Sequence, residues 1–82
     1  MQTEAIFDVL KQQIYDIFPE WETQGLSRAD SLKALNANSI DRAEILMMTM
    51  SALKLKIPMV TFGKAKNLGE LVDTFAANAS TQ

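Results

Sequence analysis

The sequence predicts an all-α fold, a bundle of three main helices and one short helix with a long loop between the first two main helices. Apolar residues recur every three or four positions over three stretches of the chain, which is the period of an amphipathic helix. No stretch alternates between apolar and polar residues, and no turn pair marks a hairpin, so strands are not expected. At 82 residues, residues 1–82 are expected to form a single domain with a small core.

The first helix is expected over residues 3–18. One stripe of this segment is apolar: Phe7, Leu10, Ile14 and Ile17. Thr3 is the expected cap, and Pro19 ends the helix because proline cannot continue it. Residues 19–38 have no sustained period. The leucines within them predict a long loop held against the core, with a helical turn near 30–35.

A second helix is expected from Ser39 to about Leu55, a segment free of Gly and Pro. Its apolar residues recur with helical spacing: Ile40, Ile45, Leu46, Thr49, Met50 and Leu53. We expect Met50 to be buried, whereas the spacing leaves open whether Met47 and Met48 belong to the core or to a docking surface.

The rest of the chain predicts a short helix and a last main helix. Pro58 and Gly63 leave room for only a turn or short helix between them. Asn67 and Glu70 have the spacing of a capping box. The helix after it has an apolar face made by four residues: Leu68, Leu71, Val72 and Phe75. The tail, 78–82, is small and polar and is expected to fray.

Composition excludes several classes of function. The chain has no Cys and no His, so it offers no thiol nucleophile, no disulfide and no ordinary proton shuttle near neutral pH, and we do not expect an enzyme. A net charge of −2 argues against a nucleic-acid-binding protein. The N-terminus lacks the features of a secretory signal, and the longest apolar run, ILMMTMSAL at 45–53, is too short to span a bilayer. A soluble, cytoplasmic monomer is expected.

Ser31 and Ser39 are the two candidates for a residue that carries chemistry, and their settings differ. Asn38 has the position of an N-cap, so Ser39 becomes the first residue of the second helix and Asp41 the third. The unpaired N–H groups and the dipole of a helix start favour an anion there. Ser31 has no comparable helix after it, because Asn36 cuts the segment short.

The segment N-S-I-D-R-A-E-I-L at 38–46 resembles the D-S-L-D-x-x-E-L signature of acyl carrier proteins. Asp41 and Glu44 fall at the second and fifth positions after the serine, as in that family. The short helix and the last helix also fit the family pattern, so the resemblance covers almost the whole chain. Choosing Ser31 would match the literal D-S-L triplet but would shift every later element by eight residues.

The resemblance implies a four-helix bundle of the acyl-carrier type. It implies that a phosphopantetheinyl transferase moves 4′-phosphopantetheine from coenzyme A to the Ser39 hydroxyl. The terminal thiol of this arm would carry an acyl group as a thioester, and the chain would catalyse nothing itself. Partner contacts are expected at residues around the serine: Asn38, Ile40, Asp41, Arg42, Ala43 and Met47.

One departure from the family pattern concerns the partner. Carriers of fatty acid synthesis usually have an acidic helix after the serine, whereas this chain has methionines, small residues and lysines at 47–56. It is more similar to donor carriers of polyketide β-branching cassettes, which hand an acetyl group to a 3-hydroxy-3-methylglutaryl (HMG) synthase-like enzyme. Acceptor carriers tend to have a Trp on that helix, and here the only Trp is Trp21.

Two alternatives remain open from the sequence. The chain can be a general carrier of polyketide, fatty-acid or peptide-synthetase pathways with a different acyl load. It can also be a helical interaction domain without a prosthetic group, in which Ser39 is only a helix-start residue.

Overall fold

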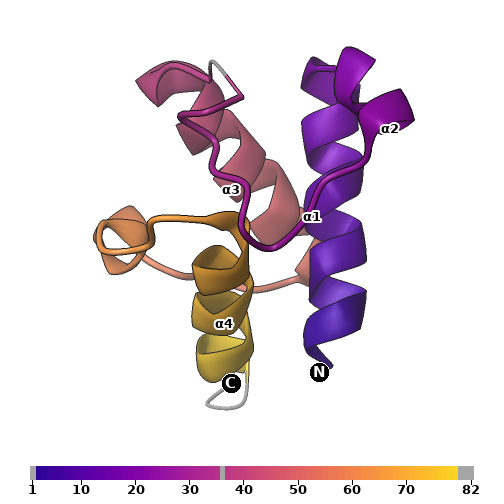
Figure 1. Ribbon diagram of the computed structural model, residues 1–82. Coiled ribbons are helices and arrows are strands. Elements are labelled where there is room, and N and C mark those ends of the chain that lie inside the picture. The colour runs from indigo at the N-terminus through magenta and orange to yellow at the C-terminus, as the bar shows by residue number, and fades with distance from the viewer. Residues whose placement is uncertain (1, 36, 80–82) are drawn as a thin grey trace.

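The computed structural model describes residues 2–35 and 37–79, and over these ranges the chain is a helical bundle without strands. It contains three main helices and two short ones: α1 (Thr3–Ile17), α2 (Glu20–Gln24), α3 (Ser39–Leu53), the 3-10 helix η1 (Met59–Phe62) and α4 (Leu68–Ala79). Helix α1 packs against both α3 and α4, and α3 leans away from α4 at the end where it begins (Figure 1). The predicted all-α bundle is confirmed.

The core is formed by the facing apolar sides of the main helices. Ile6, Leu10 and Ile14 are fully buried in α1 and define its inner stripe. Phe7 and Ile17, which the sequence placed on this stripe, are half-buried at its edge. The four apolar residues predicted for α4 are all buried, and the rings of Phe62 and Phe75 lie 4.8 Å apart.

The long loop between α1 and α3 has more structure than its sequence indicated. It contains α2, a helix too short to show a sequence period, whose half-buried Trp21 packs against the core. The predicted turn near 30–35 is present: the Leu35 N–H donates to the carbonyl oxygens of Ser31 and Leu32 at 3.1 and 3.2 Å. Leu32 and Leu35 are buried and hold the loop on the bundle.

The loop also satisfies the first N–H groups of α4. The N–H of Leu68 donates to the Asp30 carbonyl oxygen at 2.7 Å, and the N–H of Gly69 donates to the Arg28 carbonyl oxygen at 2.9 Å. The Arg28 guanidinium binds the Asp73 carboxylate at 2.8 Å. Gly69 allows this close approach, because a Cβ there would lie 3.0 Å from the Cβ of Arg28. The loop is thereby fixed beside α4.

The helix ends differ from the prediction in four places, the first being that α1 ends at Ile17 and not at residue 18. The N-cap of α1 is Gln2, without a side-chain hydrogen bond, and Thr3 is already helical. Helix α3 ends at Leu53, because Lys54 adopts a left-handed conformation with φ of 59°. Helix α4 continues through 78–79, so the expected frayed tail does not begin at residue 78, and residues 80–82 lie outside the described ranges.

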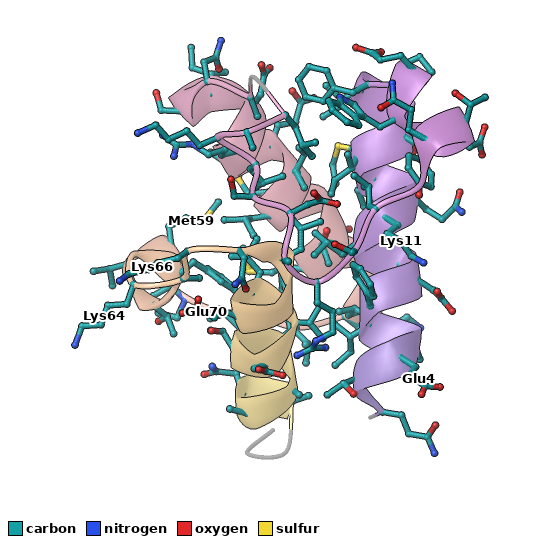
Figure 2. All side chains as sticks on the ribbon, in the orientation of Figure 1. Glu4, Lys11, Met59, Lys64, Lys66 and Glu70 are labelled. Atoms are coloured by element: carbon teal, nitrogen blue, oxygen red, sulfur yellow. The ribbon has the colours of Figure 1, made fainter. Side chains whose placement is uncertain are left out.

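Helix η1 lies at the edge of the bundle; Met59 is its first residue, and Lys64 and Lys66 follow it in the chain (Figure 2). Within the described residues, no helix has the length and apolarity needed to cross a membrane.

Candidate functional site

The start of α3 places Ser39 on the surface. The Asn38 side chain accepts a hydrogen bond from the Asp41 N–H at 2.8 Å, and the Asp41 carboxylate accepts one from the Asn38 N–H at 3.5 Å. This is the capping box of the helix, and such caps contribute about 1 kcal/mol to stability. Ser39 is therefore the first residue of α3, as predicted, and its side chain is exposed.

The surroundings of Ser39 would stabilise an anionic group attached to its hydroxyl. It stands at the N-terminus of a helix of 15 residues, where the backbone dipole and the first N–H groups carry partial positive charge. The Asp41 carboxylate partly offsets this charge, since it lies in the same first turn. The exposed Arg42 adds a full positive charge three residues after the serine.

Ser31 has a different role in the structure. Its Oγ accepts a hydrogen bond from the Ala34 N–H at 3.0 Å, so the hydroxyl caps the turn at 31–35. Its side chain is half-buried in the loop and precedes no long helix. Of the two serines, only Ser39 combines exposure with a helix N-terminus.

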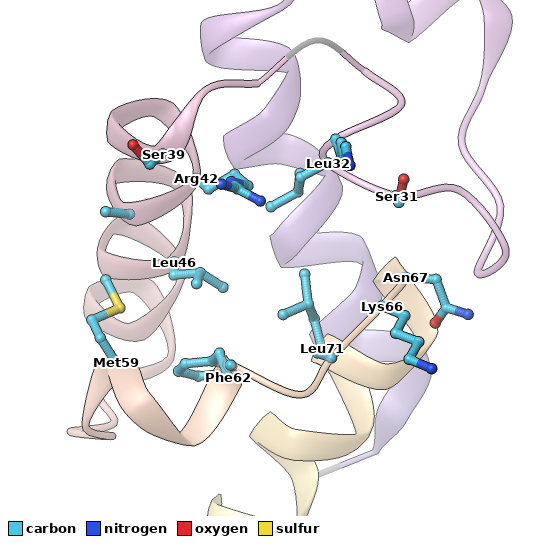
Figure 3. A pocket seen from close by; sticks show the side chains of 14 residues that line it. Ser31, Leu32, Ser39, Arg42, Leu46, Met59, Phe62, Lys66, Asn67 and Leu71 are labelled. Carbon is cyan, nitrogen blue, oxygen red and sulfur yellow. The ribbon is translucent and has the colours of Figure 1, made fainter.

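A cavity of about 520 Å³ opens beside Ser39, between the start of α3, the loop, η1 and α4 (Figure 3). Its interior is apolar, formed mainly by Leu32, Leu46, Met59, Phe62 and Leu71. Its polar residues are Ser31, Lys33, Ser39, Arg42, Lys66 and Asn67. An apolar recess of this size next to a modifiable hydroxyl can shelter a flexible chain of small-molecule dimensions.

Two of the predicted partner residues, Ile40 and Met47, lie on the outer side of α3, whereas Arg42 and Ala43 line the cavity beside Ser39. Ile40 and Met47 are 76% and 55% exposed, and because they are seven residues apart they share one side of the helix. Ala43 is half-buried between them. Asn38 and Asp41 are engaged with each other in the capping box.

The methionines of α3 separate into two groups. Met47 lies on the surface, where it borders a second recess together with Ile57 and Pro58. Met48 is half-buried. Met50, predicted to be buried, is also half-buried, and its sulfur accepts a hydrogen bond from the Ile57 N–H at 3.3 Å.

Sequence reasoning missed the contribution of η1 to this region. Met59 lines the cavity, and Val60 is the most exposed large apolar residue of the described chain at 84%. Pro58 and Gly63 in the sequence marked a short helix, but no local pattern places that helix opposite Ser39.

No group of three or more acidic, Cys or His residues in the described ranges is arranged to hold a metal ion.

Two known proteins are similar to this chain over most of its length. A polyketide biosynthesis acyl carrier protein, AcpK, from Bacillus subtilis (strain 168) is 40% identical over 73 residues, which cover 89% of each chain. No family model matches the sequence.

The second similarity is structural. A chain in the crystal structure of the curacin biosynthetic pathway HMG synthase in complex with an acetyl donor acyl carrier protein superimposes with a TM-score of 0.88 and is 45% identical. The match covers 94% of this chain and 99% of that one. The two chains are therefore of similar length, and the matched chain is taken as the carrier of that complex.

Proposed function

This chain belongs to the acyl carrier proteins of polyketide biosynthesis, and we propose that it carries an acetyl group on Ser39 and delivers it to an HMG synthase-like enzyme. The acetyl group is held as a thioester on a 4′-phosphopantetheine arm. The observation that carries this proposal is the exposed Ser39 at the capped start of α3, within a fold that matches a carrier from an acetyl donor complex over nearly its full length.

The residues around Ser39 fit the proposed arm. A phosphate on the exposed hydroxyl would lie at the N-terminus of α3, where anions are favoured. The adjacent cavity of about 520 Å³ has an apolar interior and polar groups at its rim, which suits the alternating methylene and amide groups of pantetheine.

The chain contributes one reactive atom in this proposal. During loading, Ser39 Oγ would form a bond to the coenzyme A phosphorus that bears the pantetheine group, the P–O bond to the second phosphate would break, and adenosine 3′,5′-bisphosphate would leave. The serine proton passes to a base of the phosphopantetheinyl transferase, since the nearby Asp41 carboxylate is engaged in the capping box and this chain has no His or Cys. When attached, the arm supplies the thiol that holds the acetyl group.

Delivery requires recognition by the partner enzyme. Ile40 and Met47 are exposed on the same side of α3 and offer an apolar contact surface next to Ser39. Methionine adapts to irregular surfaces, and its burial stabilises a complex without a charge that must be matched. We include Asn38, Asp41, Arg42 and Ala43 in this docking surface because they surround Ser39 on the first turns of α3.

Intact mass spectrometry tests the proposal. We expect the chain to gain one phosphopantetheine when it is incubated with coenzyme A, Mg²⁺ and a broad-specificity phosphopantetheinyl transferase. With acetyl-coenzyme A it should gain the acetylated arm, and hydroxylamine should then remove only the acetyl group. A correctly folded chain that gains no mass with either of two transferases would favour the interaction domain without a prosthetic group.

A further inference from the structure

The charged residues that line the cavity beside Ser39 are all of one sign. Lys33, Arg42 and Lys66 contribute to its lining, and no Asp or Glu does. This differs from the chain as a whole, in which the ten acidic residues outnumber the eight basic ones. The cavity therefore has a local excess of positive charge in a protein of negative net charge.

These three cations are not used to stabilise the fold. Lys11 and Arg28 form ion pairs with Asp8 and Asp73, at 3.4 and 2.8 Å. Over residues 2–35 and 37–79, no ion pair or hydrogen bond joins the side chain of Lys33, Arg42 or Lys66 to another residue. A cationic rim that the fold leaves without counter-charge is available to an anionic ligand.

Arg42 has the best position to reach an anion at Ser39. The two residues are three apart on α3, and side chains at this spacing are neighbours on one side of a helix, with Cβ atoms about 5–6 Å apart. The Arg42 side chain extends from α3 toward Leu32, across the cavity (Figure 3). A guanidinium can bind two phosphate oxygens at once.

A carboxylate in the first turn of α3 would repel an anion on Ser39, and a nearby cation would offset this repulsion. Asp41 lies two residues after Ser39 and keeps its carboxylate in the capping box. A phosphodiester on Ser39 would thus stand near a like charge of its own helix, and a neighbouring guanidinium would offset the repulsion.

We propose that Arg42 binds the phosphodiester of the arm on Ser39, with Lys33 and Lys66 adding to the positive potential across the cavity. The arm then lies over Leu46, Phe62 and Leu71 in place of extending into solvent. This inference rests on the proposed function, and it gives Arg42 a positioning role within the carrier itself.

Two measurements on the loaded chain test this inference: the ³¹P NMR shift of the phosphodiester, and the rate at which neutral iodoacetamide alkylates the arm's thiol. We expect Arg42→Gln to move the ³¹P shift toward that of the urea-unfolded loaded chain. The alkylation rate should rise about two- to fivefold, the size that an exposed charge pair typically gives. Arg42→Lys, which keeps the charge but not the planar fork, should lie in between.

Lys64→Gln is the matched control, because Lys64 is exposed, does not line the cavity and points outward from η1 (Figure 2). It should leave both values as in the wild type. Equal ³¹P shifts and alkylation rates in wild type and Arg42→Gln, on chains whose loading is established by mass, would overturn the inference and leave the carrier function intact. A wild-type chain that gains no arm at all would overturn both.

Discussion

Ser39→Ala is expected to abolish loading with phosphopantetheine completely, because it removes the only atom in the proposal to which the arm is attached. The fold should be unaffected. Ser39 is exposed, and the capping hydrogen bonds are made by Asn38 and Asp41 and not by the serine. The free energy of unfolding should therefore change by no more than about 0.5 kcal/mol, as for most surface substitutions. Intact mass after the transferase reaction measures the loading, and thermal unfolding by circular dichroism checks the fold.

Ser31→Ala is the natural control for this experiment. Ser31 lies beside the same cavity and follows an Asp in the sequence, but its hydroxyl is occupied as the cap of a loop turn. The variant should load as the wild type does. Residual loading of Ser39→Ala, or loss of loading in a folded Ser31→Ala, would contradict the assignment of the site.

Met47→Glu is expected to reduce acetyl transfer to the partner enzyme at least tenfold when loaded chains are compared at equal concentration. Met47 is exposed two turns from Ile40 on the docking surface. A carboxylate there would lose its hydration in an apolar contact, and a tenfold loss corresponds to about 1.4 kcal/mol. The rate of loss of the acetyl mass from the carrier, with and without the enzyme, gives the measurement.

Two variants separate docking from general charge effects. Gln12→Glu adds the same negative charge at an exposed position of α1 and should leave transfer within about twofold of wild type. Met47→Leu keeps an apolar side chain of similar volume and should retain most of the transfer rate. Wild-type transfer by Met47→Glu would remove Met47 from the docking surface.

Local sequence signals predicted the main helices and the position of Ser39 at the start of α3, because each depends on residues that are neighbours in the sequence. The capping box of α3 joins Asn38 and Asp41 across one turn, so its spacing is visible in the sequence. The three-residue spacing at the start of α4 is equally visible in the sequence: Asn67 Oδ1 accepts a hydrogen bond from the Glu70 N–H at 2.8 Å. The apolar periods of α1 and α4 likewise span several turns.

The features that were missed depend on contacts between distant parts of the chain. The five residues of α2 are too few for a hydrophobic period, and their place is set by the packing of Trp21 on the core. The link between Arg28 and Asp73 joins residues 45 positions apart. The cavity beside Ser39 combines four separate segments, so its positive rim is visible only after the chain has folded.

The most direct test of the central claim is the transfer of acetyl from the loaded chain to an HMG synthase-like enzyme of a polyketide pathway, followed as the change in intact mass of the carrier. The same enzyme is tested in parallel with an acetyl-loaded fatty-acid carrier whose helix after the serine is acidic. We expect the enzyme to remove the acetyl group from this chain at least tenfold faster than from the fatty-acid carrier, a preference of about 1.4 kcal/mol. An enzyme that is active with its own donor carrier but leaves the acetyl group on this chain would contradict the donor function.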